Sequence, residues 1–328
     1  MTAPGTDTPE VRAFEPADEV AVLTLLAASL GWVPDELHAR LFAWKHHENP
    51  FGVSPAWVAI SGGRVVGFRT FLRWEFVLDD QPVRAVRAVD TATHPDHQGR
   101  GVFTALTTHA LGGLGEEGLD FVFNTPNERS RPGYLRMGWQ PVRRLPVLAR
   151  PASLRSLTRI ARARTPADKW SLETAAGSPI DEVLADPAAV EALLSSLPAD
   201  GLRTRRSTAY LRWRYGFTPL SYRAVTTGGG PRDGVLIFRL RRRGPAIEAA
   251  VCEELVPAGD ATLTRRLVAD VLRTTGADYA IRLGDHGPRA GCVPLPGQGP
   301  TLLYRALRRP TPPAPQTWRL GLGDIELF

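Results

Sequence analysis

The stretch VDTATHPDHQGRGVFTALTTHAL, residues 89–111, decides the fold of the first half of the chain. It begins as a β-rich run, turns at a His-Pro pair, and passes through QGRG, residues 98–101, directly into a pattern with helical period. Glycines at a strand-to-helix turn let backbone N–H groups converge, and the amino end of a helix carries a partial positive charge. The stretch therefore predicts a cradle for a pyrophosphate; the alternative is a tight connection without a ligand. It is neither a Walker loop nor a GxGxxG fingerprint.

On both sides of this stretch the sequence predicts helices and strands in an α/β order. Apolar residues at helical spacing indicate the helices, and short β-branched or aromatic runs indicate the strands. The predicted helices are residues 18–31, 34–46, 101–114 and 127–137, and the predicted strands are a short one from residue 11, then 57–60, 65–72, 83–93 and 119–124.

QGRGVF resembles a loop that binds acetyl-CoA. It is similar to the Q/R-x-x-G-x-G/A loop of the GNAT superfamily of N-acetyltransferases, whose amides hold the pyrophosphate. Gln98 and Gly101 match this pattern, and Phe103 stands where the pattern prefers Gly or Ala. One predicted strand later, NERSRPGYLRMGW at residues 127–139 resembles the GNAT segment N-x-x-A-x-x-L-Y-x-K-x-G-F, and two blocks at this separation are more specific than either. The residues in register with this segment are Asn127, Tyr134, Gly138 and Trp139.

The resemblance implies how acetyl-CoA binds. The strand that ends at Thr93 and the strand that ends at Asn124 would diverge, and the pantetheine arm would enter the gap. Backbone groups near Ala92 and Thr93 would pair with the arm, and an amide there would stabilise the oxyanion of the tetrahedral intermediate. The acetyl-CoA-binding residues that the resemblance implies are Ala92, Thr93, Gln98, Gly99, Arg100, Gly101, Val102, Phe103 and Asn127.

Acyl transfer to an amine needs a base for the amine and an acid for the departing thiolate. The resemblance places Tyr134 as the general acid; the alternative is a ring that packs into the core. Asp90 is the candidate base, although alternation along the strand could equally make it a buried structural partner. Residues 1–150 contain no Cys, which favours direct attack in a ternary complex. His94 and His97 flank a proline turn without an evident third ligand, so no metal site is predicted.

The second half of the chain repeats the first in outline. LFAWKHHENPFG from residue 41 resembles YLRWRYGFTPLS from residue 210, and after each block come a strand, a Gly turn and two further strands. A chance similarity of two α/β domains is the alternative to a tandem duplication. Residues 256–266, VPAGDATLTRR, offer one Gly and no cradle. The second copy is therefore predicted to be degenerate and to shape the acceptor site.

These observations predict an α/β protein of the α+β type with two GNAT-like domains, each a mixed, mostly antiparallel sheet flanked by helices. Residues 1–150 are predicted to be the acyl-CoA-binding catalytic domain, residues 151–168 a basic linker, and residues 169–328 the degenerate domain. Residues 318–328 alternate in polarity, which predicts a last strand that closes the second sheet.

The net charge of +6 comes from the second half of the chain. Residues 1–150 hold 15 Lys and Arg against 17 Asp and Glu, and residues 151–328 hold 25 against 17. Because nearly all the basic residues are Arg, a coding bias explains the excess as readily as a polyanion partner, and a nucleic-acid partner is not expected. No apolar run approaches the ~18 residues that cross a bilayer, so we expect a cytoplasmic protein without membrane contact.

Three functions fit these features. The first is N-acyl transfer from acetyl-CoA to a small-molecule or protein amine, with direct attack on the thioester. The second is Fem-like aminoacyl transfer from aminoacyl-tRNA, which the basic second half favours and the CoA loop opposes. The third is acyl-CoA sensing without turnover, which Phe103 favours. The sequence favours the first.

Overall fold

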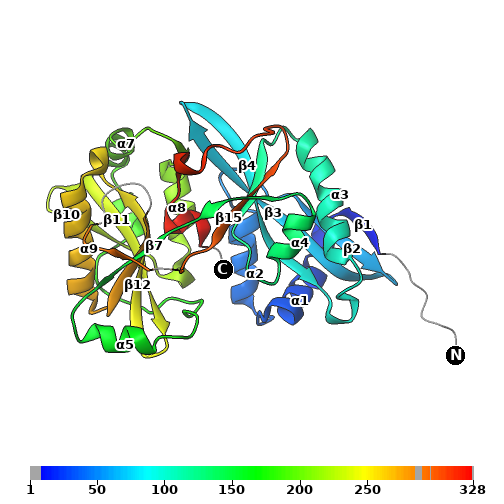
Figure 1. Cartoon of the computed structure of the whole chain (residues 1–328), viewed down its shortest axis with the longest axis horizontal. Helices are drawn as coiled ribbons and strands as arrows, with labels where there is room; N and C mark the ends of the chain where they lie inside the picture. The colour runs from blue at the N-terminus through cyan, green and yellow to red at the C-terminus, as the bar shows by residue number, and fades with distance from the viewer. Residues whose placement is uncertain (1–8, 285–289, 296, 327–328) are drawn as a thin grey trace. The chain divides into compact units, whose positions relative to one another are not determined.

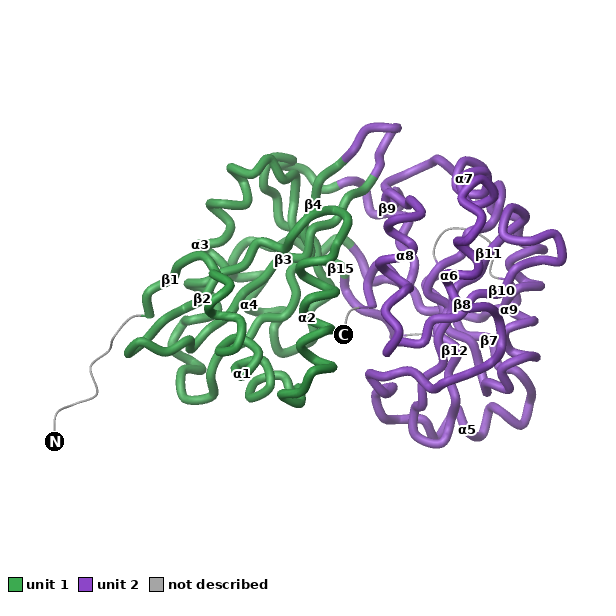
Figure 2. The backbone as a smooth tube through the Cα atoms, turned by 180° about the vertical axis from the view of Figure 1, so that it is seen from behind, with its two compact units in different colours: residues 1–76, 83–142, 302–312 green, residues 77–82, 143–301, 313–328 purple. Residues whose placement is uncertain are grey.

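The computed structural model describes residues 9–284, 290–295 and 297–326. The chain folds into two compact units, which are coloured separately in Figure 2. Neither unit is one continuous stretch of chain. Unit 1 consists of Met1–Phe76, Val83–Val142 and Leu302–Pro312, and unit 2 of Val77–Pro82, Arg143–Thr301 and Pro313–Phe328.

Unit 1 is built on a mixed sheet with the strand order β1-β2-β3-β4-β5-β15-β6, in which β6 is Gln140–Arg144. Figure 1 labels β1, β2, β3, β4 and β15 of this sheet. β1 with β2, β2 with β3, and β5 with β15 pair antiparallel, whereas β4 and β5 pair parallel. The strands are β1 (Glu10–Ala13), β2 (Ala56–Ser61), β3 (Arg64–Leu78), β4 (Gln81–Thr93), β5 (Phe121–Asn124) and β15 (Thr301–Ala306).

Helices cover both faces of this sheet. Phe42 of α2 packs against Phe68 of β3 with 6.0 Å between ring centroids, whereas Val102 of α3 packs against the neighbouring Gly67. Because successive residues of a strand point to opposite faces, α2 and α3 lie on opposite faces. A Cβ at Gly67 would lie 2.6 Å from Val102 Cγ1, so this glycine permits the close approach of α3. The helices of unit 1 are α1 (Glu19–Leu30), α2 (Glu36–His46), α3 (Val102–Glu116) and α4 (Arg131–Arg136).

Unit 2 is built on a second mixed sheet, with the strand order β14-β7-β13-β12-β11-β10-β8. β12 and β13 pair parallel, and the other neighbours pair antiparallel. The strands are β7 (Val147–Pro151), β8 (Ser178–Pro179), β10 (Arg223–Thr227), β11 (Gly230–Arg243), β12 (Ala246–Leu255), β13 (Tyr279–Leu283) and β14 (Val293–Pro294). The other described elements are α5 (Ser156–Arg162), α6 (Ile180–Val183), α7 (Pro187–Ser195), β9 (Leu202–Thr204), α8 (Thr208–Gly216), α9 (Ala261–Thr275), β16 (Trp318–Arg319) and α10 (Leu322–Ile325).

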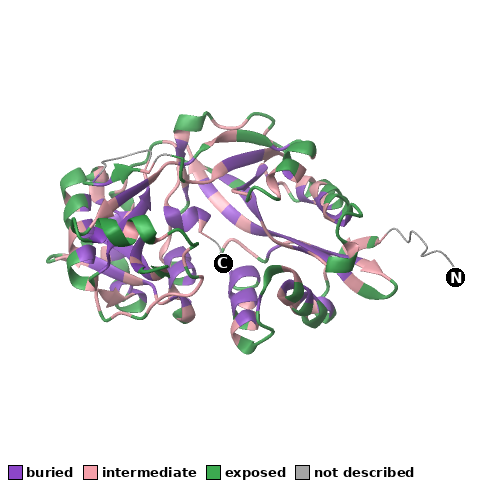
Figure 3. Cartoon of the chain, turned by 60° about the horizontal axis from the view of Figure 1, so that its bottom comes forward, coloured by how far each residue is buried: buried purple, intermediate pink, exposed green. Residues whose placement is uncertain are grey.

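The buried residues follow the sheets and the inward faces of the helices (Figure 3). In unit 1 the core under α3 joins apolar residues of β2, β3 and β5 to the aromatic rings of Tyr134 and Trp139. In unit 2 the core under α9 joins Val268 and Val271 of the helix to Val251 of β12. The predicted class, two mixed and mostly antiparallel sheets flanked by helices, is confirmed.

The two units share one order of elements. β2, β3, β4, α3 and β5 of unit 1 correspond to β10, β11, β12, α9 and β13 of unit 2, and the last strand of each set is parallel to the strand before the helix. The next position in each sheet is filled by a strand from a distant part of the sequence, since β15 pairs with β5, and β7 pairs with β13. Each unit therefore contains a strand that lies far away along the chain.

The end of the described chain differs from the predicted last strand. Within residues 318–326, only Trp318–Arg319 form a strand, β16, which pairs parallel with β9. The chain then turns into the short helix α10, because Gly321 N donates to Asp324 Oδ2 and closes the first turn. Residues 327 and 328 of that predicted strand lie outside the described residues. Across the described chain, α3 and α9 are the longest helices at 15 residues each, and neither is a candidate to cross a membrane.

Candidate functional site

The predicted cradle lies at the amino end of α3. Gly101 precedes the helix with φ of 79°, and Gly99 has φ of 74°. No side chain among the described residues caps this helix, so the N–H groups of its first turn point out of the helix without a side-chain partner. A Cβ at Gly101 would have no atom within 4 Å, so the glycine is required by its backbone conformation rather than by crowding.

The strands beside this helix diverge. β4 and β5 pair over three positions only, from Ala85 with Phe121 to Arg87 with Phe123. β4 then continues to Thr93, and Asp90 within this extension has the left-handed φ of 39°. The GNAT resemblance implies that an extended ligand binds where this pairing ends, beside the uncapped helix.

Two of the residues implied for acetyl-CoA binding hold the local backbone in place. Gln98 Nε2 donates to the carbonyl oxygen of Thr93 at 3.3 Å and so ties the loop to the end of β4. Asn127 Oδ1 accepts from Ser130 N at 2.9 Å, which sets the turn before α4. Among the other implied residues, Ala92 and Val102 are buried, whereas Gly99, Arg100 and Gly101 are exposed. The helix predicted from residue 127 begins only at Arg131 because Asn127 caps the preceding turn.

Phe103 does not obstruct the amino end of α3. Its ring packs edge-on against Tyr134, with 5.4 Å between centroids and 87° between planes. A Cβ at Gly133 would lie 2.9 Å from Phe103 Cε1, so the ring fits only because residue 133 is a glycine. Gly133 stands where the GNAT segment has Leu, so one departure from the pattern makes room for the other.

Tyr134 is buried on α4, and its hydroxyl is bound from one side. Arg69 Nη1 donates to Tyr134 Oη at 2.8 Å. The tyrosine ring also packs against Trp139, with 5.1 Å between centroids. Because the hydroxyl oxygen accepts from Arg69, its own hydrogen is left to donate in another direction. The packing role and the proton-donor role are thus compatible.

Arg69, in the middle of β3, is the feature that sequence reasoning missed. Its side chain has no exposed surface, and within the described residues its Nε and Nη2 have no hydrogen-bond partner. Nη1 also donates to Thr91 Oγ1, and the guanidinium lies 4.4 Å from the centroid of the Phe71 ring. No carboxylate in the described chain pairs with it. In the sequence, an Arg within an otherwise apolar strand was the feature that could have indicated this site.

A buried guanidinium without an anion is costly, since its desolvation is not repaid by an opposite charge. Groups that stay unsatisfied in the interior of a protein are frequent at ligand sites. Arg69 contacts Thr91 of β4 and Tyr134 of α4. The arrangement therefore offers positive charge and free N–H donors beside the diverging strands, where a thioester and its departing thiolate would lie.

Asp90 belongs to a buried cluster with two residues of α2. Asp90 Oδ2 accepts from Lys45 Nζ and from His46 Nε2, both at 2.8 Å. Burial alone raises the pKa of Asp90, but the Lys45 ammonium and the His46 hydrogen bond outweigh it, so the pKa lies well below its usual value. Burial lowers the pKa of His46 despite the neighbouring carboxylate. A carboxylate held in this way is a weak base.

The geometry of Asp90 thus favours the structural alternative that strand alternation left open. The cluster ties α2 to β4 at the residue with positive φ, directly before Thr91 and Ala92. This cluster could not be predicted from a sequence pattern, because Lys45 and His46 precede Asp90 by more than forty positions. In the described part of the chain, no group of His, Cys, Asp and Glu side chains could hold a metal ion.

Residues 10–142 match the sequence model of the GNAT acetyltransferase domain. A comparison with curated proteins gives no match. Among solved structures, a protein of unknown function from Enterococcus faecalis V583, described as a probable N-acyltransferase, is 13% identical with a TM-score of 0.64, over 92% of this chain and 73% of that chain.

Two further solved structures are similar over nearly the whole chain. A GCN5-related N-acetyltransferase from Anabaena variabilis is 12% identical with a TM-score of 0.63, over 91% of this chain and 73% of that chain. Eis1 from Mycobacterium abscessus is 18% identical with a TM-score of 0.57, over 91% of this chain and 73% of that chain. At these identities the likeness establishes the fold, which agrees with the predicted GNAT-like architecture.

Proposed function

We propose that this chain, whose residues 10–142 match the sequence model of the GNAT acetyltransferase domain, transfers an acyl group from acyl-CoA to an amine. The observation that carries the proposal is the contact between Arg69 and Tyr134 beside an uncapped helix and two diverging strands. Each part suits one portion of the donor. The helix would bind the phosphates, the gap between the strands would hold the pantetheine arm, and Arg69 and Tyr134 would lie beside the thioester.

We assign phosphate binding to the amino end of α3. The N–H groups of Val102 and Phe103 belong to the first helical turn and are available to phosphate oxygens. Gly99 and Gly101 give the loop the left-handed backbone that this turn requires. Arg100 is exposed beside them and adds a positive charge.

Tyr134 is proposed as the general acid. When the amine attacks the thioester carbon, the carbon–sulfur bond breaks and the electron pair leaves on sulfur, where it takes the proton of the tyrosine hydroxyl. Arg69 fixes the orientation of that hydroxyl and brings a positive charge near the negative charge that develops. We assign Arg69 the role of a positioning residue for Tyr134.

The amine has to arrive uncharged, since a lysine-like amine has a pKa of ~10.4. We assign its deprotonation to a water relay rather than to direct contact with Asp90, because that carboxylate is engaged by Lys45 and His46. Asp90 is then a positioning residue that holds the end of β4. Attack occurs directly within a ternary complex, because unit 1 lacks any cysteine to form an acyl-enzyme.

The donor and the acceptor are tested together by a thiol-release assay. The full chain is mixed with acetyl-, propionyl- or succinyl-CoA and with a panel of amines that includes aminosugars, polyamines, amino acids and lysine peptides. Release of CoA thiol that requires both partners supports the proposal. Tight CoA binding without thiol release over the whole panel would support acyl-CoA sensing instead, and transfer only from aminoacyl-tRNA would support the Fem-like alternative.

A further inference from the structure

Two leucines project from the surface of unit 2, at α5 and at the turn before it. Leu154 is 85% exposed and Leu157 is 46% exposed. Leu157 N donates to the carbonyl oxygen of Leu154 at 3.2 Å, so the turn leads directly into the helix. Residues three apart in a helical turn lie on the same side. A single exposed apolar residue is ordinary, but a pair on one side indicates contact with another apolar surface.

Arginines follow the same segment at helical spacing. Arg155, Arg159 and Arg162 are separated by four and three positions, Arg164 comes two residues later, and all four are exposed. Residues 151–167 contain no Asp or Glu. Among the residues that the structure describes, no carboxylate pairs with Arg155, Arg162 or Arg164. We call the two leucines and these four arginines the α5 face.

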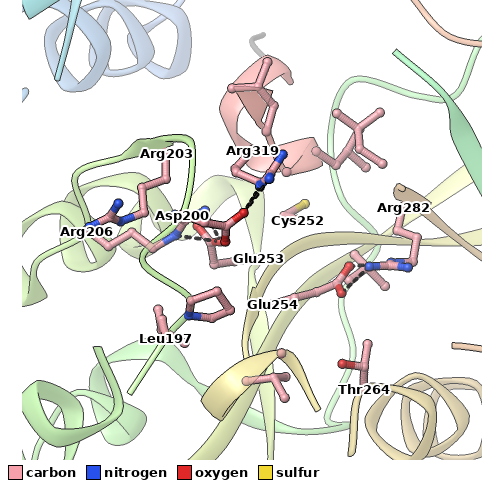
Figure 4. Close-up of a pocket in the computed structure, with 18 of the residues that line it drawn as sticks. Leu197, Asp200, Arg203, Arg206, Cys252, Glu253, Glu254, Thr264, Arg282 and Arg319 are labelled. Atoms are coloured by element: carbon pink, nitrogen blue, oxygen red, sulfur yellow. Dashed lines mark hydrogen bonds and ion pairs between the residues drawn. The ribbon is translucent and has the colours of Figure 1, made fainter. Parts of the chain in front are cut away.

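Other arginines of unit 2 are engaged by carboxylates. Four of them line a cavity of about 600 Å³, which Figure 4 shows, and each has a carboxylate partner. The pairs are Arg203 with Asp80, Arg206 with Glu253, Arg282 with Glu254, and Arg319 with Asp200. The positive charges of the cavity are thus compensated within the protein, whereas those of Arg155, Arg162 and Arg164 are not.

The α5 face is fixed to the sheet of unit 2 on its inner side. Ser156 is buried, and Arg159 Nη1 donates to Oδ1 of Asp278, the residue before β13, at 3.1 Å. Arg243, at the end of β11, donates from Nε to the carbonyl oxygen of Thr165 at 2.9 Å. Because these contacts already hold the segment, little conformational freedom is lost when its outer side binds a partner.

The side chains of the α5 face favour one kind of partner. A nucleic acid would neutralise the arginines but would leave both leucines in water. A second copy that packed through the same face on a two-fold axis would place arginines against arginines. A bilayer with anionic lipids suits both kinds of side chain, because its headgroups attract the arginines and its acyl boundary takes up the leucines.

We propose that the α5 face binds the surface of a membrane that contains anionic lipids, with Leu154 and Leu157 inserted at the level of the headgroups. The inference does not depend on the acyltransferase activity of unit 1. The sequence alone predicts no membrane contact, because no apolar run is long enough to cross a bilayer. A helix that lies in the plane of the interface needs no such run. Two inserted side chains give a reversible contact rather than a permanent anchor.

Sedimentation of the full chain with vesicles tests the proposal. Vesicles of phosphatidylcholine alone are compared with vesicles of equal parts phosphatidylcholine and phosphatidylglycerol. We expect binding to the anionic vesicles to be at least about tenfold tighter, and added salt should reduce this difference because exposed charges are screened. Equal binding to both kinds of vesicle, or no sedimentation with the anionic vesicles at millimolar lipid, would overturn the proposal.

Two multiple variants separate the apolar contact from the charged one. Leu154→Ser combined with Leu157→Ser should weaken binding to the anionic vesicles by about tenfold, because the apolar contact is lost. Arg155→Gln combined with Arg162→Gln and Arg164→Gln should lower binding to the level seen with phosphatidylcholine alone. Undiminished binding in either variant would refute the assignment.

Two matched controls change exposed residues outside the α5 face. Val20→Ser removes an apolar side chain that is 78% exposed on α1, and Arg273→Gln removes an exposed arginine of α9. Both should leave vesicle binding unchanged. Melting curves check that every variant is folded. Equal losses in the controls and in the α5 variants would show that the membrane contact lies elsewhere.

A DNA duplex distinguishes a lipid surface from a nucleic acid. We expect the duplex to bind at least about tenfold more weakly than the anionic vesicles, since it offers no contact to the leucines. If the leucine variant binds vesicles as tightly as the natural chain does, while the arginine variant loses both vesicles and duplex, the face binds polyanions through charge alone. The lipid assignment would then be wrong.

Discussion

The hydroxyl of Tyr134 accepts a hydrogen bond of 2.8 Å from Nη1 of Arg69, a guanidinium with no exposed surface and no carboxylate partner in the described chain. This contact joins β3 to α4 across the end of β4. It gives the proposed acid a fixed orientation, and it places an uncompensated positive charge at the point where a thiolate has to leave.

Replacing Arg69 should separate stability from activity. Arg69→Met keeps most of the side-chain volume and removes a buried charge, so the free energy of unfolding should stay the same or rise. Turnover should fall by about tenfold to a hundredfold, because the developing negative charge loses its electrostatic support. The matched control is Arg73→Met in the same strand, where Arg73 pairs with Glu117 near the surface, and turnover should not change. A destabilised Arg69→Met protein with full turnover would make Arg69 structural.

Gly101→Ala tests the cradle without adding bulk. The new Cβ meets no atom within 4 Å, but φ of 79° is unfavourable for alanine by about 1 to 2 kcal/mol, so the turn should shift. CoA affinity, measured by calorimetry, should fall by about tenfold. Gly112→Ala, on the same helix and also in open space, should leave affinity unchanged and stabilise the helix by up to ~1 kcal/mol. Equal affinities in the two variants would remove the loop from the phosphate site.

Gly133→Ala should change the free energy of unfolding in opposite directions with and without the ring of Phe103, and a double-mutant cycle measures this. In the natural chain, Gly133→Ala brings a Cβ to 2.9 Å from Phe103 Cε1 and should lower the free energy of unfolding. In a Phe103→Ala background that contact is gone, and Gly133→Ala should stabilise α4 by up to ~1 kcal/mol through helix propensity. Urea unfolding of the four proteins measures both effects. The same sign in both backgrounds would show that the two residues are not fitted to each other.

The cluster of Asp90 and His46 should make the protein sensitive to mild acid. In the folded chain the pKa of His46 lies below its usual value, so below about pH 6.5 the unfolded chain takes up a proton that the folded chain does not. The free energy of unfolding should therefore fall as pH drops from 6.5 to 5, by about 1.4 kcal/mol for each unit by which the pKa is lowered. The pKa of Asp90 is also lowered, so its contribution is present above its unfolded value of ~3.9 and is lost only in stronger acid.

His46→Gln isolates this contribution, since the amide can still donate to Asp90 but does not titrate. Urea unfolding between pH 5 and pH 7, in the range where imidazole titrates, should give a shallower pH dependence for this variant than for the natural chain. His109→Gln changes an exposed histidine of α3 and should keep the natural slope. If His46→Gln keeps that slope as well, His46 is not held neutral by burial.

The local parts of this site could be predicted from the sequence. The glycines around Arg100 predicted the turn into α3, and the apolar run of residues 119–124 predicted the strand between that loop and Tyr134. Both features depend on neighbouring residues, which a sequence pattern records directly. The delayed start of α4 at Arg131 is also local, because Asn127 binds the turn before it.

The remaining features depend on contacts between distant parts of the chain. Asp90 meets Lys45 and His46 only when α2 has packed on the sheet, so strand alternation alone could not choose between a base and a structural partner. The pairings of β15 with β5 and of β7 with β13 join strands that lie far apart in the sequence, and no periodic pattern encodes them. The role proposed for Arg69 follows only from its hydrogen bond to Tyr134, which lies sixty-five residues later in the sequence.

The turnover of Tyr134→Phe tests the central claim most directly. The substitution keeps the ring against Phe103 and Trp139 and deletes only the hydroxyl that accepts from Arg69. Because Arg69 loses that acceptor, a loss of about 1 to 3 kcal/mol in stability is expected, and rates are compared per folded molecule at saturating acetyl-CoA and amine. We predict a fall of about 10²- to 10⁴-fold in turnover with unchanged CoA affinity. A fall of less than about threefold would show that Tyr134 only packs, and that the proton for the leaving thiolate comes from another group.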